Sequence, residues 1–364
     1  MMIRNIAFAV VGLSVLLASP LAAQQPVSRG TNLSADAAGD GRIAIDLAGD
    51  IWIVPPRGGT AKRLTPNLKS AQRPRWSPDA SEIAYQAVSQ GLQGIWIYSF
   101  DTGESRHIGR GSSFDMHPAW HPGGERLVYA SDAAGAGLDL WEVDLLSGLH
   151  WRLSDRPGDE SDAAWSADGR DLVYVHRHAE GWSLILRRHG LPEEILLSAA
   201  DRLAGPSWRP DGSLISYFRA GEAGPVVEIV ILAQPRLVRK YTRGEAYGMA
   251  PVSWLDRHRM VYTADGIIRQ RLFNAWTSST LPFQATIEAE KPEALAQRPE
   301  RRPLPSIDEP DGRLIVHATR MFDGVGGGYQ VDRDIIIDGG RITAVEPHSD
   351  RSDAIVIDMG DLTV

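Results

Sequence analysis

The chain has 364 residues, which at roughly 150 residues per domain predicts two or three domains. Hydrophobic residues make up 43% and charged residues 23%, values typical of globular proteins, which argue against general disorder and against a multispan membrane protein. The formal net charge of -8 has the wrong sign for contact with phosphate backbones, so we expect no nucleic-acid partner. The sequence contains no cysteine, which excludes disulfides, thiolate catalysis and thiolate metal sites.

The N-terminus has the layout of a secretory signal peptide. Arg4 precedes an apolar run over residues 6–17, and the small residues that follow offer a cleavage site after Ala23. An uncleaved membrane anchor is the alternative, but the run is shorter than the roughly 20 residues of a spanning helix, and Pro20 interrupts it. We therefore assign residues 1–23 to a signal peptide and expect a periplasmic or secreted protein, with no membrane contact beyond that segment.

A tryptophan-centred repeat fills the middle of the chain. Its five tryptophans are spaced 44, 45, 43 and 46 residues apart and are Trp76, Trp120, Trp165, Trp208 and Trp254. Each is followed by a short strand-like run that ends in a tyrosine, namely Tyr85, Tyr129, Tyr174, Tyr217 and Tyr262. A degenerate sixth unit precedes them at residues 40–45.

A second strand signature lies later in the units, for example at residues 95–103 and 140–148, where alternating apolar residues end at a glycine turn. A period in the forties with short strands is typical of propeller blades, because each four-stranded sheet must cover its face against the next. A β-sandwich, the alternative, predicts turns every ~8–12 residues without that period. We therefore expect an all-β protein with a six-bladed β-propeller over residues 30–286.

The Trp-Ser-Pro-Asp turn and the strand after it resemble the repeats of TolB-like propellers, and similar repeats form the non-catalytic propeller of prolyl oligopeptidase family enzymes. The resemblance implies a fold rather than a function. The tryptophans could form a binding stripe, but their place at the same turn of every blade favours interblade packing, and we assign them no functional role. No Gly-x-Ser-x-Gly motif occurs, so the nucleophile of a prolyl oligopeptidase is not expected.

The composition shifts to Glu, Arg, Lys and Pro over residues 287–312, which predicts a linker. Residues 313–324 then predict a strand and turn, and residues 334–347 predict a hairpin across Asp338-Gly339-Gly340. A further strand pair is expected over residues 354–364.

This C-terminal series resembles the N-terminal β-sandwich segment of the amidohydrolase superfamily. The matching motifs are Thr-Arg-x-Phe-Asp-Gly at residues 319–324 and Ile-Asp-Met-Gly at residues 357–360. The resemblance implies the N-terminal part of a composite β-sandwich over residues 313–364, truncated here. In that family a barrel follows, which holds one or two divalent metals of the zinc type.

Two pairs of histidines could carry metal chemistry. His176 and His178 have a spacing that places two ligands on one face of a strand, but the third ligand of a metal site is missing, and we favour an exposed loop. His117 and His121 flank Trp120, yet a proline follows each, so the two cannot share a helical face as zinc ligands would. We expect blade packing or exposure at the rim.

Two other segments have a plainer interpretation as loops. An acidic cluster could bind calcium through its hard oxygen ligands, although a solvated interblade loop is favoured; it consists of Asp155, Asp159, Glu160 and Asp162. The run Gly324–Gly328 resembles a phosphate loop only in glycine content, and we expect a flexible strand connector. The sequence therefore assigns no catalytic, cofactor-binding or metal-ligating residue to this chain.

Two functional hypotheses follow. The first is the N-terminal portion of an exported amidohydrolase-like hydrolase acting on carbon–nitrogen bonds, with the propeller as the substrate-gating or binding module and the chain itself inactive. Its ligand would be a peptide-like substrate. The second is a non-catalytic periplasmic module that binds a protein partner. The C-terminal motif favours the first hypothesis, on analogy of fold.

Overall fold

The structure is a computed structural model that describes residues 24–65, 69–89, 91–110, 113–135, 137–222, 224–241, 244–248, 250–288, 313–322, 330–339, 341–351 and 355–359. The chain divides into two compact units, Met1–Ala289 and Glu290–Val364. The predicted signal peptide and residues 289–312 of the predicted linker lie outside the described residues. In the part of the chain that the structure describes, no helix is long and apolar enough to cross a membrane.

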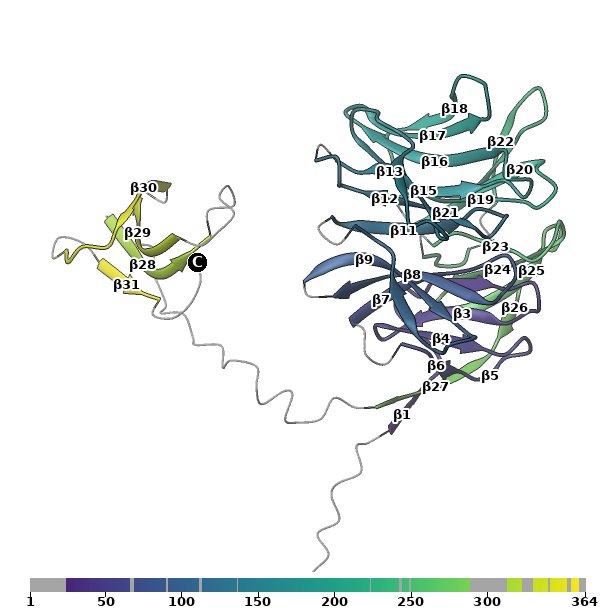
Figure 1. Cartoon of the computed structure of the whole chain (residues 1–364), viewed down its shortest axis with the longest axis horizontal. Helices are drawn as coiled ribbons and strands as arrows, with labels where there is room; N and C mark the ends of the chain where they lie inside the picture. The colour runs from purple at the N-terminus through teal and green to yellow at the C-terminus, as the bar shows by residue number, and fades with distance from the viewer. Residues whose placement is uncertain are drawn as a thin grey trace, which may run out of the picture. The chain divides into compact units, whose positions relative to one another are not determined.

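The first unit is a ring of six four-stranded antiparallel blades (Figure 1). Blade 1 contains β2 (Ala35–Ala37), β3 (Ile43–Leu47), β4 (Asp50–Val54) and β6 (Lys62–Arg63). Blade 2 contains β7 (Lys69–Trp76), β8 (Glu82–Ser89), β9 (Leu92–Ser99) and β10 (Ser105–His107). Blade 3 contains β11 (Asp115–Trp120), β12 (Arg126–Ser131), β13 (Asp139–Asp144) and β14 (His150–Arg152). The predicted all-β fold class is confirmed.

The remaining three blades follow the same order from the inner strand outward. Blade 4 contains β15 (Asp159–Trp165), β16 (Asp171–His178), β17 (Gly181–Arg188) and β18 (Glu194–Ala199). Blade 5 contains β19 (Leu203–Trp208), β20 (Leu214–Arg219), β21 (Val226–Ile231) and β22 (Leu237–Lys240). Blade 6 contains β23 (Ser253–Trp254), β24 (Arg259–Ala264), β25 (Ile267–Leu272) and β26 (Ser279–Leu281). Contacts of β2 with β23 and β24 bring the last blade against the first.

The middle strands are apolar on both faces because each blade is packed between two others. In β8, Ile83 and Tyr85 contact blade 1, whereas Ala84 between them contacts blade 3, as the two-residue period of a strand requires. Six hydrophobic clusters fill the six interfaces between neighbouring blades in this way. The tyrosines that end the predicted strands are all buried in these clusters: Tyr85, Tyr129, Tyr174, Tyr217 and Tyr262.

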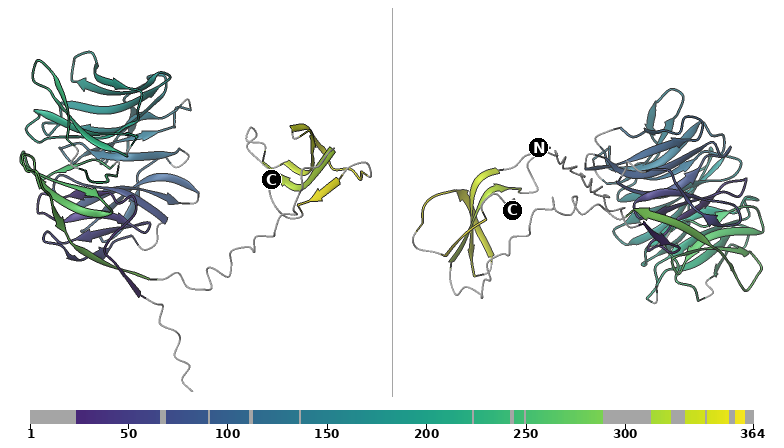
Figure 2. Two further views of the ribbon diagram at one scale, coloured as in Figure 1. Left: turned by 180° about the vertical axis from the view of Figure 1, so that it is seen from behind. Right: turned by 90° about the horizontal axis from the view of Figure 1, so that it is seen from below.

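Strands from the two ends of the propeller unit close the ring at blade 1. β27 (Phe283–Glu288) pairs in parallel with β5 (Gly59–Thr60), which precedes the outer strand of blade 1. On its other side β27 pairs antiparallel with β1 (Gln24–Val27), and both strands lie beside blade 1 in Figures 1 and 2. The first and last blades are therefore joined by a separate three-stranded sheet. They do not share a single blade built from strands of both chain ends.

This sheet extends beyond the predicted bounds of the propeller at both ends. β27 continues to Glu288, two residues beyond the predicted end at residue 286, and β1 starts at Gln24, before the predicted start at residue 30. The composition shift at residue 287 does not mark the end of the strand, because the alternating apolar residues Phe283, Ala285 and Ile287 continue across it and pack between blades 1 and 6.

The second unit contains one four-stranded sheet, in the order β30 (Arg341–Pro347), β29 (Gln330–Asp338), β28 (Arg313–Met321) and β31 (Ile355–Asp358). β29 and β30 form the hairpin predicted across Asp338-Gly339-Gly340. β31 pairs with β28 in parallel, and residues 354 and 360–364 of the strand pair predicted over residues 354–364 lie outside the described residues.

Candidate functional site

The inner strands of four consecutive blades carry the same irregularity. β7, β11, β15 and β19 each shift register three residues before the tryptophan of their blade. The residue at the shift has a left-handed backbone, with φ of 52° at Arg73, 55° at His117, 51° at Asp162 and 56° at Gly205. Such a bulge redirects one side chain out of the sheet, and for residues other than glycine the conformation costs of order 1 kcal/mol or more. The side chains of three blades are thereby turned toward the axis of the ring.

These three side chains meet in the channel. Arg73 Nη1 lies 2.6 Å from Asp162 Oδ1, and His117 Nδ1 lies 3.3 Å from the same oxygen without an aligned hydrogen bond. Asp162 is only 6% exposed. Burial opposes its ionisation, but the His117 and Arg73 side chains outweigh that effect and lower the pKa of Asp162 to about 2. Burial, together with the Arg73 charge, lowers the pKa of His117 to about 3, so His117 is neutral at pH 7.

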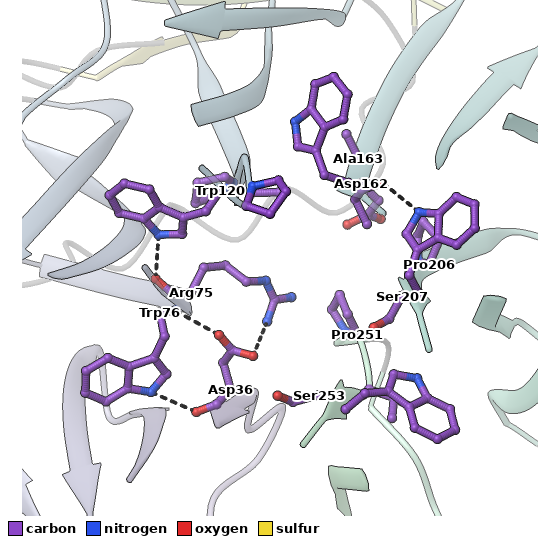
Figure 3. A pocket seen from close by; sticks show the side chains of 18 of the residues that line it. Asp36, Arg75, Trp76, Trp120, Asp162, Ala163, Pro206, Ser207, Pro251 and Ser253 are labelled. Atoms are coloured by element: carbon purple, nitrogen blue, oxygen red, sulfur yellow. Dashed lines mark hydrogen bonds and ion pairs between the residues drawn. The ribbon is translucent and has the colours of Figure 1, made fainter. Parts of the chain in front are cut away.

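A cavity of about 310 Å³ lies on the tryptophan side of this trio. Its walls come from five tryptophans and from prolines of several blades, with the polar groups of Asp36, Ser207 and Ser253 between them (Figure 3). A second cavity of about 440 Å³ shares Arg73 with the first. Arg73 therefore lies between the two open parts of the channel.

The tryptophans themselves join neighbouring blades, as predicted. The indole N–H of Trp120 donates to the carbonyl of Arg75 at 3.0 Å (Figure 3). The indole N–H of Trp208 donates to the carbonyl of Ala164 at the same distance. Trp76 makes the equivalent bond to Asp36 at 3.1 Å. That these residues have no functional role stays a prediction, since they also border the cavity.

Arg75 projects its guanidinium into the cavity (Figure 3). Nη1 lies 3.8 Å from Asp36 Oδ1, longer than a hydrogen bond, while Asp36 Oδ2 accepts the backbone N–H of Trp76 at 2.8 Å. Among the described residues the guanidinium makes one hydrogen bond, from Nη1 to the carbonyl of Pro74 at 3.3 Å. Burial lowers the pKa of Arg75 without neutralising a group of such high pKa. The cavity thus contains a cation with unused donors.

The structure corrects the loop interpretation of the acidic cluster. Asp159, Glu160 and Asp162 belong to the inner strand β15, and only Asp155 of the four is exposed. Glu160 is 0% exposed, and neither of its carboxylate oxygens has a hydrogen-bond partner among the described residues. Burial, followed by the charges of Asp139 and Glu193, raises the pKa of Glu160 to about 7. The bulge places Glu160 and Asp162 on the two sides of one strand, which a loop would not do.

Replacing Glu160 with glutamine should stabilise the protein at neutral and higher pH. A folded-state pKa above the usual 4.5 means that stability is lost as the pH rises from about 4.5 through about 7. Glutamine removes that loss, so we expect the free energy of unfolding to increase by about 1–3 kcal/mol at pH 8 and to change little at pH 5. Urea unfolding at both pH values measures the difference. An equal effect at the two pH values would contradict the charge-based explanation.

The structure confirms the packing predicted for His121 and contradicts the exposed loop predicted for His176 and His178. His176 and His178 lie within β16 rather than in an exposed loop, because that strand continues to residue 178, and His176 is buried with Nε2 3.0 Å from the carbonyl of Pro157. His121 packs edge-on against Trp165 of the next blade, as expected for blade packing. His117 lies instead in the channel.

One sequence candidate remains untested, and one channel residue was not predicted. The glycine run at 324–328 lies outside the described residues. Arg73 was not singled out, although its position three residues before a tryptophan, shared with His117 and Asp162, was available as a signal. In the described part of the chain, one group of three side chains could hold a metal ion, and it lies in the C-terminal sheet: His317, Asp334 and His348.

Comparison with known proteins gives a consistent fold. The protein-family model described as "TolB beta propeller domain" matches residues 50–265. TolB from Acinetobacter baumannii has a TM-score of 0.55 at 17% identity, covering 70% of this chain and 66% of that one. The tricorn protease has a TM-score of 0.57 at 14% identity, covering 85% and 30% respectively. Structural similarity at such low identity concerns the fold alone.

Among curated proteins, the uncharacterized peptidase YuxL of Bacillus subtilis (strain 168) is 30% identical over 123 residues, which are 32% of this chain and 19% of YuxL. The uncharacterized protein Atu1656 of Agrobacterium fabrum is 24% identical over 181 residues, which are 46% of this chain and 61% of that protein. The chain therefore spans less than two thirds of the length of these relatives.

Proposed function

Because the chain belongs to the TolB β-propeller domain family, we propose that its propeller binds peptide-like ligands in the channel and serves an exported hydrolase of carbon–nitrogen bonds. The observation that carries the proposal is the Arg75 guanidinium in the tryptophan- and proline-lined cavity. Aromatic and proline walls suit the apolar parts of a peptide, and a guanidinium with spare donors suits a carboxylate. A cavity of about 310 Å³ accommodates a short terminal segment of a peptide rather than a folded domain.

The cavity also has the charge balance that ligand selection needs. Arg73 is matched by Asp162, and Asp36 Oδ1 lies 3.8 Å from Arg75 Nη1, so the channel carries no large excess of either charge. Arg75 is the cation whose donors a ligand could use without breaking an existing hydrogen-bonded pair. A C-terminal carboxylate bound there would accept two N–H donors in the bidentate geometry that guanidinium favours.

The hydrolase part of the proposal is supported by the motifs at residues 319–324 and 357–360 and by the peptidase named among the relatives. In such a hydrolase one or two divalent metals of the zinc type would lower the pKa of a bound water and supply the attacking hydroxide. Those metals would lie in a barrel, and no barrel strand occurs among the described residues. We therefore assign no catalytic step to this chain, whose part would be to bind or screen the substrate.

Export is part of the same proposal. The layout of residues 1–23 supports a cleaved signal peptide and a periplasmic or secreted location. N-terminal sequencing of the mature protein should then begin at Gln24. An unprocessed Met1 on protein recovered from the cell envelope would contradict cleavage.

The alternative is a non-catalytic module that binds a periplasmic protein partner through the same channel. Its support is the fold shared with TolB from Acinetobacter baumannii. Both alternatives use the cavity, so peptide binding tests their common part. The mass of the native protein separates them, because a hydrolase parent requires a species larger than 39.8 kDa by the residues of a barrel.

Peptide binding can be measured through the tryptophans that line the cavity. We expect an N-acetylated tripeptide with a free C-terminal carboxylate to change the intrinsic fluorescence, and the corresponding tripeptide amide to bind at least about tenfold more weakly. Ser207→Phe should abolish the response by filling the cavity, in which Ser207 is a wall residue. Ala134→Phe adds the same side chain at an exposed position and serves as the control.

Three outcomes would count against parts of the proposal. Equal binding of acid and amide would contradict carboxylate recognition by Arg75. Binding unaffected by Ser207→Phe would place the ligand outside the cavity. A native mass close to that of the chain less its signal peptide would favour the interaction module over the hydrolase.

A further inference from the structure

The C-terminal sheet brings two imidazoles and one carboxylate together from three neighbouring segments. His317 on β28 and Asp334 on β29 are directly paired across the sheet, and His348 follows β30 by one residue. The two histidine rings are 4.0 Å apart between centroids. The possible ligand atoms of all three side chains lie within 4.8 Å of one another.

We propose that His317, Asp334 and His348 form a binding site for a divalent transition metal of the zinc class. Imidazole nitrogen and carboxylate oxygen are established ligand types for such ions, and three protein ligands with an open fourth position are a common arrangement. The proposal concerns this chain alone and goes beyond the peptide-binding function of the propeller.

The distances place the donor atoms close to a coordination shell. Asp334 Oδ1 lies 3.0 Å from His317 Nδ1 and 2.8 Å from His348 Nδ1. Ligand atoms around a tetrahedral zinc ion with bonds of about 2.0–2.1 Å are separated by about 3.3 Å. The two distances from Asp334 Oδ1 to the histidine nitrogens would therefore have to lengthen by only a few tenths of an ångström. Without it, both imidazoles direct a nitrogen at the same oxygen.

The burial of Asp334 requires a positive partner. This side chain is only 1% exposed, and a carboxylate in such a position is costly unless it is compensated. Arg351 Nε approaches Asp334 Oδ2 only to 4.0 Å, and its Nη2 is bonded to Glu346 at 2.5 Å. A metal ion between Asp334 Oδ1 and the two imidazoles would place a positive charge directly against this carboxylate, beside the more distant Arg351.

The groups around the cluster hold its ligands in position. The backbone N–H of Ser349 donates to Asp334 Oδ2 at 3.2 Å, which leaves Oδ1 toward the histidines. Asp332 has a left-handed backbone, with φ of 55°, and its Oδ1 lies 3.6 Å from His317 Nε2, the nitrogen that the metal would not use. A carboxylate behind a ligating imidazole is the usual second partner of metal-bound histidine. The backbone N–H of His348 donates to the Asp332 carbonyl at 3.1 Å.

Metal binding at this point would connect three adjacent segments of the sheet. His348 is the most exposed of the three, with 34% of its side chain accessible, so water can reach the ion and complete its coordination. A ligand that binds only the folded sheet stabilises it by mass action. We therefore expect binding to increase the protection of backbone amides in β28, β29 and β30.

The test titrates Zn²⁺ alone into the full chain after removal of metals with a chelator, using calorimetry. We expect one Zn²⁺ per chain, with affinity reduced more than about 100-fold by His317→Ala or His348→Ala and about 10- to 100-fold by Asp334→Asn. His178→Ala is the matched control, because His178 also packs against a second histidine, His176, with ring centroids 5.2 Å apart. That variant should bind as the unmodified chain does.

Hydrogen exchange on the unmodified protein gives a readout that does not depend on whether a variant folds. Added Zn²⁺ should slow exchange in residues 313–321 and 330–347 and leave the propeller unchanged. The proposal is overturned if no Zn²⁺ binds, if binding survives both His317→Ala and His348→Ala, if it is lost in His178→Ala, or if exchange in these strands does not change.

Discussion

Replacing Asp162 with alanine should destabilise the propeller by about 3–5 kcal/mol at pH 7, because the substitution leaves the Arg73 guanidinium in the channel without its carboxylate. Arg73 is itself largely buried, and its contact with Asp162 joins blade 2 to blade 4 across the axis. Urea unfolding followed by circular dichroism measures the loss. Asp155→Ala removes an exposed carboxylate just before the same blade and should change stability by less than about 0.5 kcal/mol.

A second pair of substitutions separates charge from packing at this position. In the background of Arg73→Gln, Asp162→Asn should cost far less than it does alone, because the guanidinium that Asp162 pairs with is no longer present. Additive effects of the two substitutions would contradict a direct pairing between Arg73 and Asp162.

The pH dependence of stability should also follow from the channel residues. The folded pKa of Asp162 is lowered to about 2, so its contribution is complete above the ordinary value of 3.8 and is lost as the pH falls through about 2. His117 acts in the same direction at higher pH. Its pKa is lowered from 6.5 to about 3, so between these pH values the unfolded chain binds a proton that the folded chain does not. Stability therefore falls as the pH falls through this range. Glu160 has the opposite sign, since its raised pKa costs stability above about pH 4.5.

Replacing Phe283 with alanine should cost about 3–5 kcal/mol, which is the usual range for a buried phenylalanine. Phe283 is 4% exposed and packs in the cluster that joins blade 1 to blade 6. It also begins β27, where it pairs with Gly59. The substitution therefore removes apolar contacts at the one blade interface that the three-stranded closing sheet covers.

Gln284→Ala is the matched control for this prediction. Gln284 is the next residue of the same strand, its side chain is exposed, and its carbonyl accepts the backbone N–H of Ala61 at 2.8 Å, which alanine would preserve. We expect a change within about 0.5 kcal/mol. Equal denaturation midpoints for Phe283→Ala and Gln284→Ala would show that ring closure does not depend on the apolar contacts of β27.

Ring closure by the two chain ends bears on the proposed function as well. β27 is the last described strand before residues 289–312 and the C-terminal unit. A ligand bound in the channel contacts residues from several blades, so the geometry of the cavity depends on a closed ring. Phe283→Ala should accordingly weaken peptide binding only to the extent that it unfolds the propeller, which a comparison of binding and folded fraction would reveal.

The sequence by itself determined the repeating part of this protein. The spacing of Trp76, Trp120 and the later tryptophans predicted the blades, their apolar runs predicted the middle strands, and the Asp338-Gly339-Gly340 turn predicted the hairpin. These features are local, because a strand buried on both faces must be apolar along its length and a tight turn requires particular residues. The closing strands β1 and β27 were missed, since their pairing joins the two ends of the propeller unit rather than neighbouring segments of the chain.

Only the tertiary structure decided which polar side chains meet. Arg73, His117 and Asp162 are separated by 44 and 45 residues, and a bulge in each strand turns them toward a common axis. His317 and Asp334 are likewise joined by strand pairing, with no motif in the sequence between them. Such contacts depend on the number of blades, the closure of the ring and the register of the strands. These are long-range properties of the fold, and no local pattern of residues encodes them.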